Sequence, residues 1–184
     1  MQTILSEKIV RIIKNKKRLE KLLNVKITNK GKEVTINGTV EEEYKAMKVI
    51  DALNFGFSFS AAISIKKEDR IFEIINIKDY TNKSNLERIR GRIIGKSGKA
   101  IGTLANLTKC YIELKDNQVG IIGESEYIEG ATEGIVEIIQ GAKHGNVYKG
   151  LEKNQPKPIY DLGLRSEKEP ITMKEYEKRL KEKE

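Results

Sequence analysis

The segment GRIIGKSG, from Gly91 to Gly98, has residue types and a spacing that suit phosphate binding. Glycine has no Cβ atom, so its main chain can approach a phosphate closely. Backbone amides at the start of a helix attract anions, and a lysine beside them adds positive charge. Nucleotide-binding P-loops end in the same Gly-Lys-Ser, so the phosphates could belong to a bound nucleotide or to a nucleic-acid chain.

The spacing of the glycines argues against a P-loop. A P-loop needs four residues between its first glycine and Gly-Lys-Ser, with a buried apolar strand before it. Here three residues separate Gly91 from Gly95, and the preceding NLERIR is charged and predicted to be helical. No acidic residue at the end of an apolar strand follows to hold magnesium. A nucleotide-binding enzyme and a plain glycine turn between two helices remain as alternatives.

The positive charge of the chain is concentrated in two windows. The 184 residues carry a net charge of +8, with 38% hydrophobic and 34% charged residues, which is typical of a soluble globular protein. Residues 8–26 contain eight cations and one anion, and residues 83–99 contain six cations and one anion. The two windows together hold +12, so the rest of the chain carries about −4. Such segregation is expected of a protein that binds a polyanion.

The chain also repeats itself with a shift of 85 residues and no gap. The shift places eight apolar or glycine positions on equivalent residues, namely Leu19 on Leu104, Ile27 on Ile112, Val34 on Val119, Ile36 on Ile121, Gly38 on Gly123, Ala46 on Ala131, Leu53 on Ile138 and Gly56 on Gly141. A tandem duplication of a unit of about 70–80 residues accounts for this pattern.

Both units predict two strands followed by a helix. In the first, residues 25–38 alternate around a glycine turn, and residues 39–56 have helical spacing after a Thr39–Glu42 capping box. In the second, residues 111–123 predict the strands and residues 125–141 the helix, whose Gly130 and Gly134 would allow close packing on the sheet.

The second unit adds elements before this pair of strands. Residues 71–80 predict a strand, and a Ser84–Glu87 capping box predicts a short helix through Ile94. After the GKSG loop, residues 99–109 predict another helix.

The segment IIGKSGKAI matches the Ile-Gly-x-x-Gly-x-x-Ile signature of the K-homology (KH) domain, and the order of elements resembles its type I form. The resemblance implies a glycine loop that clamps about four unpaired nucleotides in a narrow groove. The predicted RNA-binding residues are Arg88, Arg90, Arg92, Ile94, Gly95, Lys96, Ser97, Gly98 and Lys99. Cations would meet phosphates, while Ile94 and the strand beginning at Tyr111 would form apolar walls for bases.

We therefore predict an α+β fold of two tandem type I KH domains, each with the order strand-helix-helix-strand-strand-helix. The expected boundaries are residues 1–65 for the first domain, 70–151 for the second, and 152–184 for a proline-containing linker and charged tail in which Thr172 and Glu175 could cap a helix. The first domain is predicted to be degenerate, because either Val10-Arg11-Ile12-Ile13 or Lys14-Asn15-Lys16-Lys17 occupies the place of GKSG. It could bind RNA by charge, dock a protein or brace its neighbour.

Five further segments, IINIKDY, RIRGRIIGKSGK, LTKCYIEL, VGIIG and GAKHGNVYKGLEK, resemble the archaeal double-KH proteins of the partner-of-Nob family over residues 1–153. Members of that family assist assembly of the small ribosomal subunit. The resemblance implies binding near the 3′ end of small-subunit rRNA, beside the endonuclease that matures it, and a contact with translation initiation factor two. The family pattern has Thr and Arg where this chain has Ala100 and Ile101. A KH adaptor in RNA degradation or translational control is the alternative.

The remaining residues predict a non-catalytic protein without a cofactor. One histidine, His144, and one cysteine, Cys110, cannot build a structural zinc site, and a histidine-based acid–base pair is not expected either. We expect Cys110 at the edge of the core and His144 in packing or partner contacts. Because no apolar run approaches membrane-spanning length and no signal peptide is apparent, a cytoplasmic location is expected.

Overall fold

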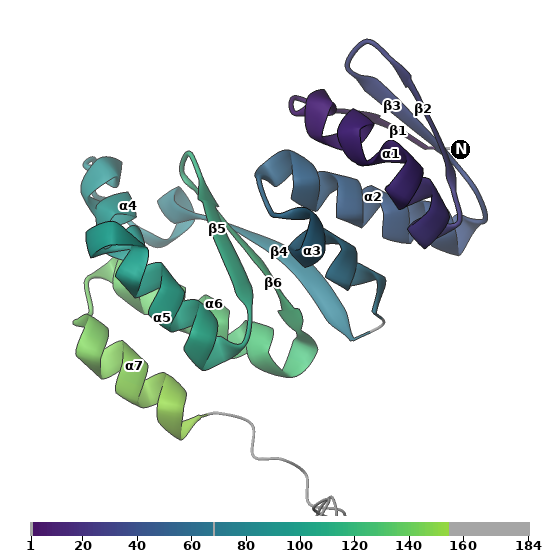
Figure 1. Cartoon of the computed structure of the whole chain (residues 1–184). Helices are drawn as coiled ribbons and strands as arrows, with labels where there is room; N and C mark the ends of the chain where they lie inside the picture. Colours follow the sequence, from purple (N-terminus) through teal and green to yellow (C-terminus); the bar gives the residue numbers. More distant parts are fainter. Residues whose placement is uncertain (1, 68, 155–184) are drawn as a thin grey trace, which may run out of the picture.

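The computed structural model of the chain describes residues 2–67 and 69–154. The first unit comprises β1 (Gln2–Leu5), α1 (Ile9–Leu23), β2 (Lys26–Lys30), β3 (Glu33–Asn37), α2 (Val40–Phe55), α3 (Phe59–Ile63) and a 3-10 turn (Ser64–Lys66). The second unit comprises β4 (Arg70–Asn76), a 3-10 turn (Ile77–Tyr80), α4 (Leu86–Ile94), a 3-10 turn (Lys96–Gly98), α5 (Lys99–Thr108), β5 (Tyr111–Lys115), β6 (Gln118–Glu124), α6 (Ser125–Gln140) and α7 (His144–Lys153). The prediction of a mixed α+β fold is confirmed (Figure 1).

Each unit contains a three-stranded antiparallel sheet with the same topology. The strand orders are β1-β3-β2 and β4-β6-β5, so the last strand of each unit lies in the middle of its sheet. The shift of 85 residues found in the sequence places β2 on β5 and α2 on α6 without an offset at either end. The repeat in the sequence is therefore a repeat of structure.

The first unit departs from the predicted order of elements. One continuous helix, α1, joins its first two strands, whereas the second unit has α4, the GKSG loop and α5 in the same place. The prediction of two helices before the second strand of the first unit is thus wrong. Helix α1 is continuous because no glycine lies between Ile9 and Leu23, so nothing in the sequence breaks it.

Local capping explains where two helices begin. Thr39 and Glu42 form the predicted capping box at α2, because the Thr39 side chain accepts from the Glu42 N–H and the Glu42 carboxylate accepts from the Thr39 N–H at 3.1 Å. The predicted Ser84–Glu87 box is wrong by one residue. Asn85 is the cap of α4, and its side-chain oxygen accepts from the Arg88 N–H at 3.0 Å.

The two units meet through an aromatic cluster. Phe55 and Phe57 of the first unit pack against Phe72 of β4, with ring centroids 5.7–6.1 Å apart. The cluster lies on Gly120 of β6, where a Cβ atom would come within 2.8 Å of both Phe55 and Phe57. The units therefore share one packed boundary, and the absence of a side chain at position 120 allows it.

The last helix, α7, packs on α6 and α5. A Cβ atom on Gly134 would lie 3.1 Å from Leu151, so this glycine serves contact between α6 and α7 and not the predicted contact with the sheet. The predicted end of the second domain at residue 151 falls inside α7. The predicted tail helix capped by Thr172 lies outside the described residues.

Candidate nucleic-acid interface

The GKSG loop joins the end of α4 to the start of α5. Gly95 has φ 71° and Gly98 has φ 77°, both in the region that favours glycine, and Ser97 between them has φ 54°. The Gly95 N–H donates to the Gly91 carbonyl at 2.8 Å and thereby closes α4. The loop therefore turns sharply and delivers the chain directly to the N-terminal end of α5, where backbone amides favour an anion.

The two loop glycines differ in what surrounds them. A Cβ atom on Gly95 would lie 2.5 Å from the Ala100 Cβ atom and 2.8 Å from its backbone nitrogen. A Cβ atom on Gly98 would meet no atom within 4 Å. Gly95 is thus packed against α5, whereas Gly98 faces open space from which a ligand could approach the backbone.

The predicted cations separate into two groups. Lys96 and Lys99 are exposed in the loop and at the start of α5, and Arg88 is exposed in the first turn of α4. No described carboxylate lies within 4.0 Å of these three cations. Arg90 instead donates to the Asp116 carbonyl at 3.4 Å, in the turn between β5 and β6. Three predicted cations are therefore available to a phosphate chain, and Arg90 holds the opposite side of the groove.

Arg92 is also held by the fold. Its guanidinium donates to the Ala142 carbonyl after the end of α6, and its own carbonyl lies 2.9 Å from Nε2 of His144 at the start of α7. His144 therefore packs within the fold, as the sequence predicted. Arg92, predicted to bind RNA, has a half-buried side chain that ties α4 to the loop before α7, so its RNA-binding role stays a prediction.

The first unit has a similar contact that the sequence interpretation missed. Arg11 of α1 donates to the Gly56 carbonyl at 2.8 Å, just beyond the end of α2. In both units an arginine from the helical segment before the hairpin binds the carbonyl end of the last long helix, where the helix dipole favours a cation. In the sequence, these contacts were indicated only by the aligned glycines Gly56 and Gly141, which mark the ends of the two helices.

The apolar residues predicted to contact bases come from the end of α4 and from β5. Ile94 is 39% exposed beside the loop, as expected of a base contact. On β5, however, Ile112 and Leu114 face the helices, because they pack in the core of the second unit. Tyr111 points to the other face, with its ring 5.9 Å from the Arg70 guanidinium. Within the strand that begins at Tyr111, Ile112 and the half-buried Leu114 are therefore the apolar residues on the helix-covered face.

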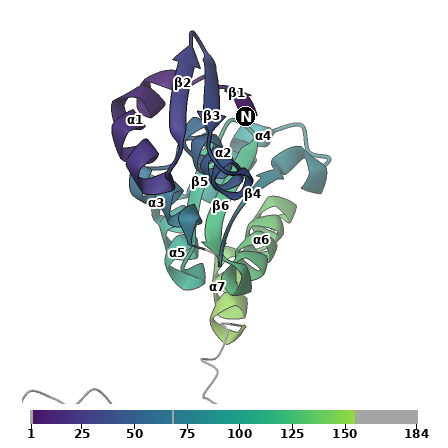
Figure 2. The same ribbon diagram turned by 90° about the vertical axis from the view of Figure 1, so that its right-hand side faces the viewer.

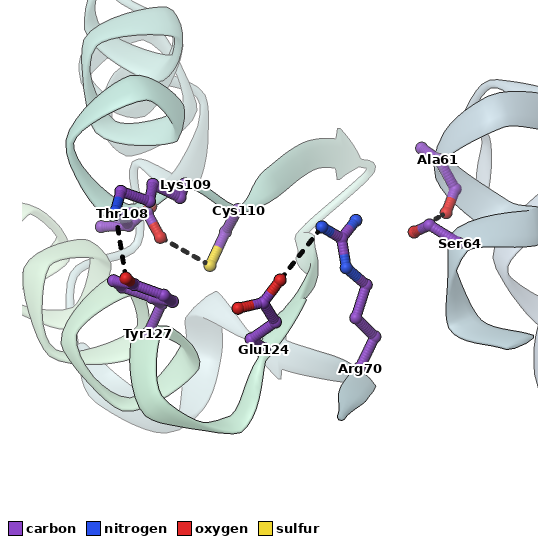
Figure 3. A network of polar contacts seen from close by, with 8 residues as sticks. All are labelled: Ala61, Ser64, Arg70, Thr108, Lys109, Cys110, Glu124 and Tyr127. Atoms are coloured by element: carbon purple, nitrogen blue, oxygen red, sulfur yellow. Dashed lines mark hydrogen bonds and ion pairs between the residues drawn. The ribbon is translucent and has the colours of Figure 1, made fainter. Parts of the chain in front are cut away.

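A second polar cluster lies at the opposite end of the sheet (Figure 3). There Lys109 donates to the Tyr127 hydroxyl at 3.0 Å, and Arg70 pairs with Glu124 at 3.3 Å. The Cys110 thiol donates to the Thr108 carbonyl at 3.2 Å, and burial raises the pKa of the thiol. Cys110 is buried in the core of the second unit, farther inside than the predicted core edge. Nε of Arg70 is also buried and has no hydrogen-bond partner among the described residues.

No three His, Cys, Asp or Glu side chains within residues 2–67 and 69–154 are placed to hold a metal ion. No helix in that part of the chain has the length and apolar character needed to cross a membrane. The loop between α4 and α5 is therefore the candidate site.

Comparison with known proteins agrees with this geometry. Residues 71–156 match the family model of the second KH domain of Pno1 proteins, a eukaryotic-type (type I) KH domain. The structure of Dim2p from Pyrococcus horikoshii is 31% identical, with a TM-score of 0.75 over 83% of this chain and 98% of that chain. The chain belongs to the Dim2/Pno1 family of KH proteins. The resemblance to the partner-of-Nob family is thus confirmed.

Two further relatives show the range of this Dim2/Pno1 family. A KH domain-containing protein of Methanocaldococcus jannaschii is 34% identical over 149 residues, which is 77% of this chain and 66% of that protein. The pre-rRNA-processing protein PNO1 of Chaetomium thermophilum is 33% identical over 138 residues, 70% of this chain and 53% of its own. The chain therefore spans about two thirds of the archaeal relative and about half of the fungal one.

A second Dim2 structure contains bound partners. The complex of a/eIF2alpha, aDim2p and rRNA from Pyrococcus horikoshii is 30% identical, with a TM-score of 0.76 over 84% of this chain and 93% of that chain. In the family, then, this fold has been seen together with rRNA. The P-loop alternative loses its basis, because helix α4 and not a strand precedes the loop in this chain.

Proposed function

We propose that this protein binds single-stranded RNA near the 3′ end of small-subunit rRNA through the GKSG loop and assists maturation of that rRNA. It does so as a non-catalytic assembly factor. The observation that carries the proposal is the open approach to Gly98, with exposed Lys96 and Lys99 next to it in the chain and the N-terminal end of α5 directly after it. Each feature favours a phosphate chain.

The relatives support the choice of RNA. The names of the fungal relatives describe pre-rRNA processing, and a solved relative was crystallised with rRNA and a/eIF2alpha. By this likeness, we propose that the chain contacts translation initiation factor two and works beside the endonuclease that matures the rRNA 3′ end. The exposed Ile94 adds an apolar contact for a base, which a duplex would not present.

We also propose that both units are KH domains, the first of them degenerate. The identical strand orders and the coincidence of β2 with β5 and α2 with α6 support a shared origin. The single helix α1 in place of α4, loop and α5 leaves the first unit without a clamp. Recognition of unpaired nucleotides therefore belongs to the second unit, with working boundaries of residues 1–65 and 70–151.

The Gly98→Asp variant tests the proposed function. The new side chain would enter open space, and aspartate tolerates the positive φ of Gly98 better than most residues, so the fold should persist with some backbone strain. Its carboxylate would repel the phosphates that approach the loop. We expect loss of binding to a short single-stranded RNA with the 3′-terminal sequence of the small-subunit rRNA, measured by fluorescence anisotropy. Gly31→Asp in the turn between β2 and β3 is the matched control, because Gly31 also has a positive φ of 60° and a Cβ atom there also meets nothing within 4 Å.

The control should bind as tightly as the native protein. Equal affinity of Gly98→Asp and the native protein would show that the loop does not clamp RNA. Circular dichroism of both variants checks that each remains folded.

A further inference from the structure

A groove lies where α5, α6 and α7 meet in the second unit. Its floor contains the half-buried Leu107 and Leu151, and Gly130 of α6 contributes no side chain to it. Thr108, which also lines it, donates its hydroxyl to the Leu104 carbonyl at 2.8 Å, so this hydroxyl keeps no free proton to donate. The groove has a volume of about 180 Å³. Its floor therefore suits an aliphatic side chain.

The rim of this groove is acidic. Glu126, Glu129 and Glu133 line it from α6 and are exposed, and no described cation lies within 4.0 Å of their carboxylates. Because Glu129 and Glu133 are four residues apart on one helix, they repel each other in the free protein. Helix α6 contains four glutamates and no lysine or arginine, in a chain whose net charge is +8. Cations bound at this rim would relieve the repulsion.

The groove lies away from the GKSG loop. The loop precedes the first residue of α5, whereas Leu107 and Thr108 are the last two residues of that helix. At 1.5 Å per residue, the two ends of α5 are about 14 Å apart. In Figure 2, α7 lies at the lower end of the molecule, and α1 and β2 of the first unit lie at the upper end. A segment bound in the groove would therefore meet neither the first unit nor an RNA strand at the loop.

The charges of the groove decide between the candidate occupants. RNA does not fit, because its phosphates would meet three carboxylates. Residues 155–184 of this chain begin beside the groove, since Asn154 lines it, but they contain eight cations and seven anions and are nearly neutral. The basic helix α1 of a second copy would make a head-to-tail contact, which leads to open chains of molecules. A lysine- or arginine-rich segment of another protein, with leucine-like side chains, matches both the rim and the floor.

We propose that the groove between α5, α6 and α7 binds a basic segment of a partner protein. An aliphatic side chain of this segment packs against Leu107 and Leu151, and its cations pair with Glu129 and Glu133. The GKSG loop stays open to RNA while the segment is bound. The inference does not depend on which RNA the loop binds, because the two sites lie at opposite ends of α5 and attract opposite charges.

Binding of a synthetic peptide to the full chain tests the inference. The probe is a short fluorescent peptide of lysine and leucine with the leucines at helical spacing, and a second peptide has alanine in place of each leucine. The rim variant is Glu129→Lys/Glu133→Lys. Its matched control, Glu33→Lys/Glu73→Lys, makes the same change of net charge at exposed glutamates of β3 and β4. Lysine and glutamate have similar helix propensities, so the rim variant should fold.

We expect the leucine peptide to bind the native chain and the control with similar affinity, and the rim variant about tenfold more weakly. The alanine peptide should bind all three proteins weakly. A saturating amount of a short single-stranded RNA should not displace the leucine peptide. Equal binding of the leucine peptide by the rim variant and the control, equal affinity of the two peptides, or displacement by the RNA would overturn the inference.

Filling the floor of the groove tests the apolar contact without a change in charge. Gly130→Leu adds an aliphatic side chain at a position where a Cβ atom would lie 3.8 Å from Leu151. It should weaken binding of the leucine peptide at least tenfold, because the leucine of the peptide loses its place. Gly145→Leu is the control, since it lies at the other end of α7 and a Cβ atom there meets nothing within 4 Å. Equal affinity of these two variants would contradict the proposed contact.

Carbodiimide coupling of carboxylates to nearby lysines, in the full chain without peptide, tests the other occupants. We expect no links from Glu129 or Glu133 to residues 155–184 of the same chain or to a second copy. Links within one chain would show that its own C-terminal residues fill the groove, and links between copies would show self-association. Either result would overturn the assignment of the groove to a partner protein.

Discussion

Gly95 and Gly98 share a left-handed backbone but serve different purposes. At Gly95 the Ala100 side chain and backbone occupy the space of any Cβ atom, so glycine there is required to close the loop onto α5. At Gly98 nothing occupies that space, so glycine leaves the backbone accessible.

The same distinction separates two arginines of α4. Arg88→Ala removes an exposed charge and should weaken RNA binding and reduce its salt slope by about 0.7, without a change in stability. Arg92→Ala removes the donor to the Ala142 carbonyl and should lower the free energy of unfolding by about 1.5–3 kcal/mol. Urea unfolding and anisotropy titrations of both variants check this. A stable Arg92→Ala protein with weak RNA binding would return Arg92 to the group of phosphate contacts.

How much the sequence could predict depends on the range of the interactions involved. The GKSG loop and the Thr39 capping box follow from patterns within a few residues, and the structure agrees with both. The partner of Arg92 is 50 residues away in the chain, and no local pattern indicates it. Likewise, the face on which Tyr111 lies depends on the register of β5 against β6.

At the scale of elements, two glycines of α6 differ in how closely they approach α7 and can be compared directly. Gly130 and Gly134 both lie inside α6, but a Cβ atom would be 3.8 Å from Leu151 at the first and 3.1 Å at the second. Gly130→Ala should therefore raise the free energy of unfolding by about 0.5–1 kcal/mol, because alanine is the better helix former. Gly134→Ala should gain less or lose stability, since Leu151 and Val147 must move.

Thermal unfolding of the two alanine variants, followed by circular dichroism, measures this difference. An equal gain at both positions would show that α7 adjusts freely to α6. Because α7 also carries His144 against the Arg92 carbonyl, a shift of α7 in Gly134→Ala would be transmitted to the end of α4. Short-RNA affinity should then fall slightly in Gly134→Ala and not in Gly130→Ala.

The helix α1 shows why one element of the fold was predicted incorrectly. The aligned repeat suggested two helices in each unit, since the second unit has two. Helix formation is decided locally, however, and the first unit has no residue that ends α1 before Leu23. The left-handed Asn24 ends it instead. Because the first unit has no such loop, its basic segment forms one continuous helix where the second unit has two helices joined by the GKSG turn.

At the scale of the whole molecule, the aromatic boundary fixes α1 relative to the GKSG groove. Gly120→Val would push against Phe55 and Phe57, each within 2.8 Å of the added Cβ atom, and should cost about 1–3 kcal/mol. Because the GKSG loop is built within the second unit, binding of a short single-stranded RNA should survive in this variant. Small-angle X-ray scattering should show a larger radius of gyration. Gly102→Val, where a Cβ atom meets nothing within 4 Å, is the control for the added side chain. A Gly120→Val protein with native stability and an unchanged radius of gyration would show that the aromatic boundary adjusts to the added side chain.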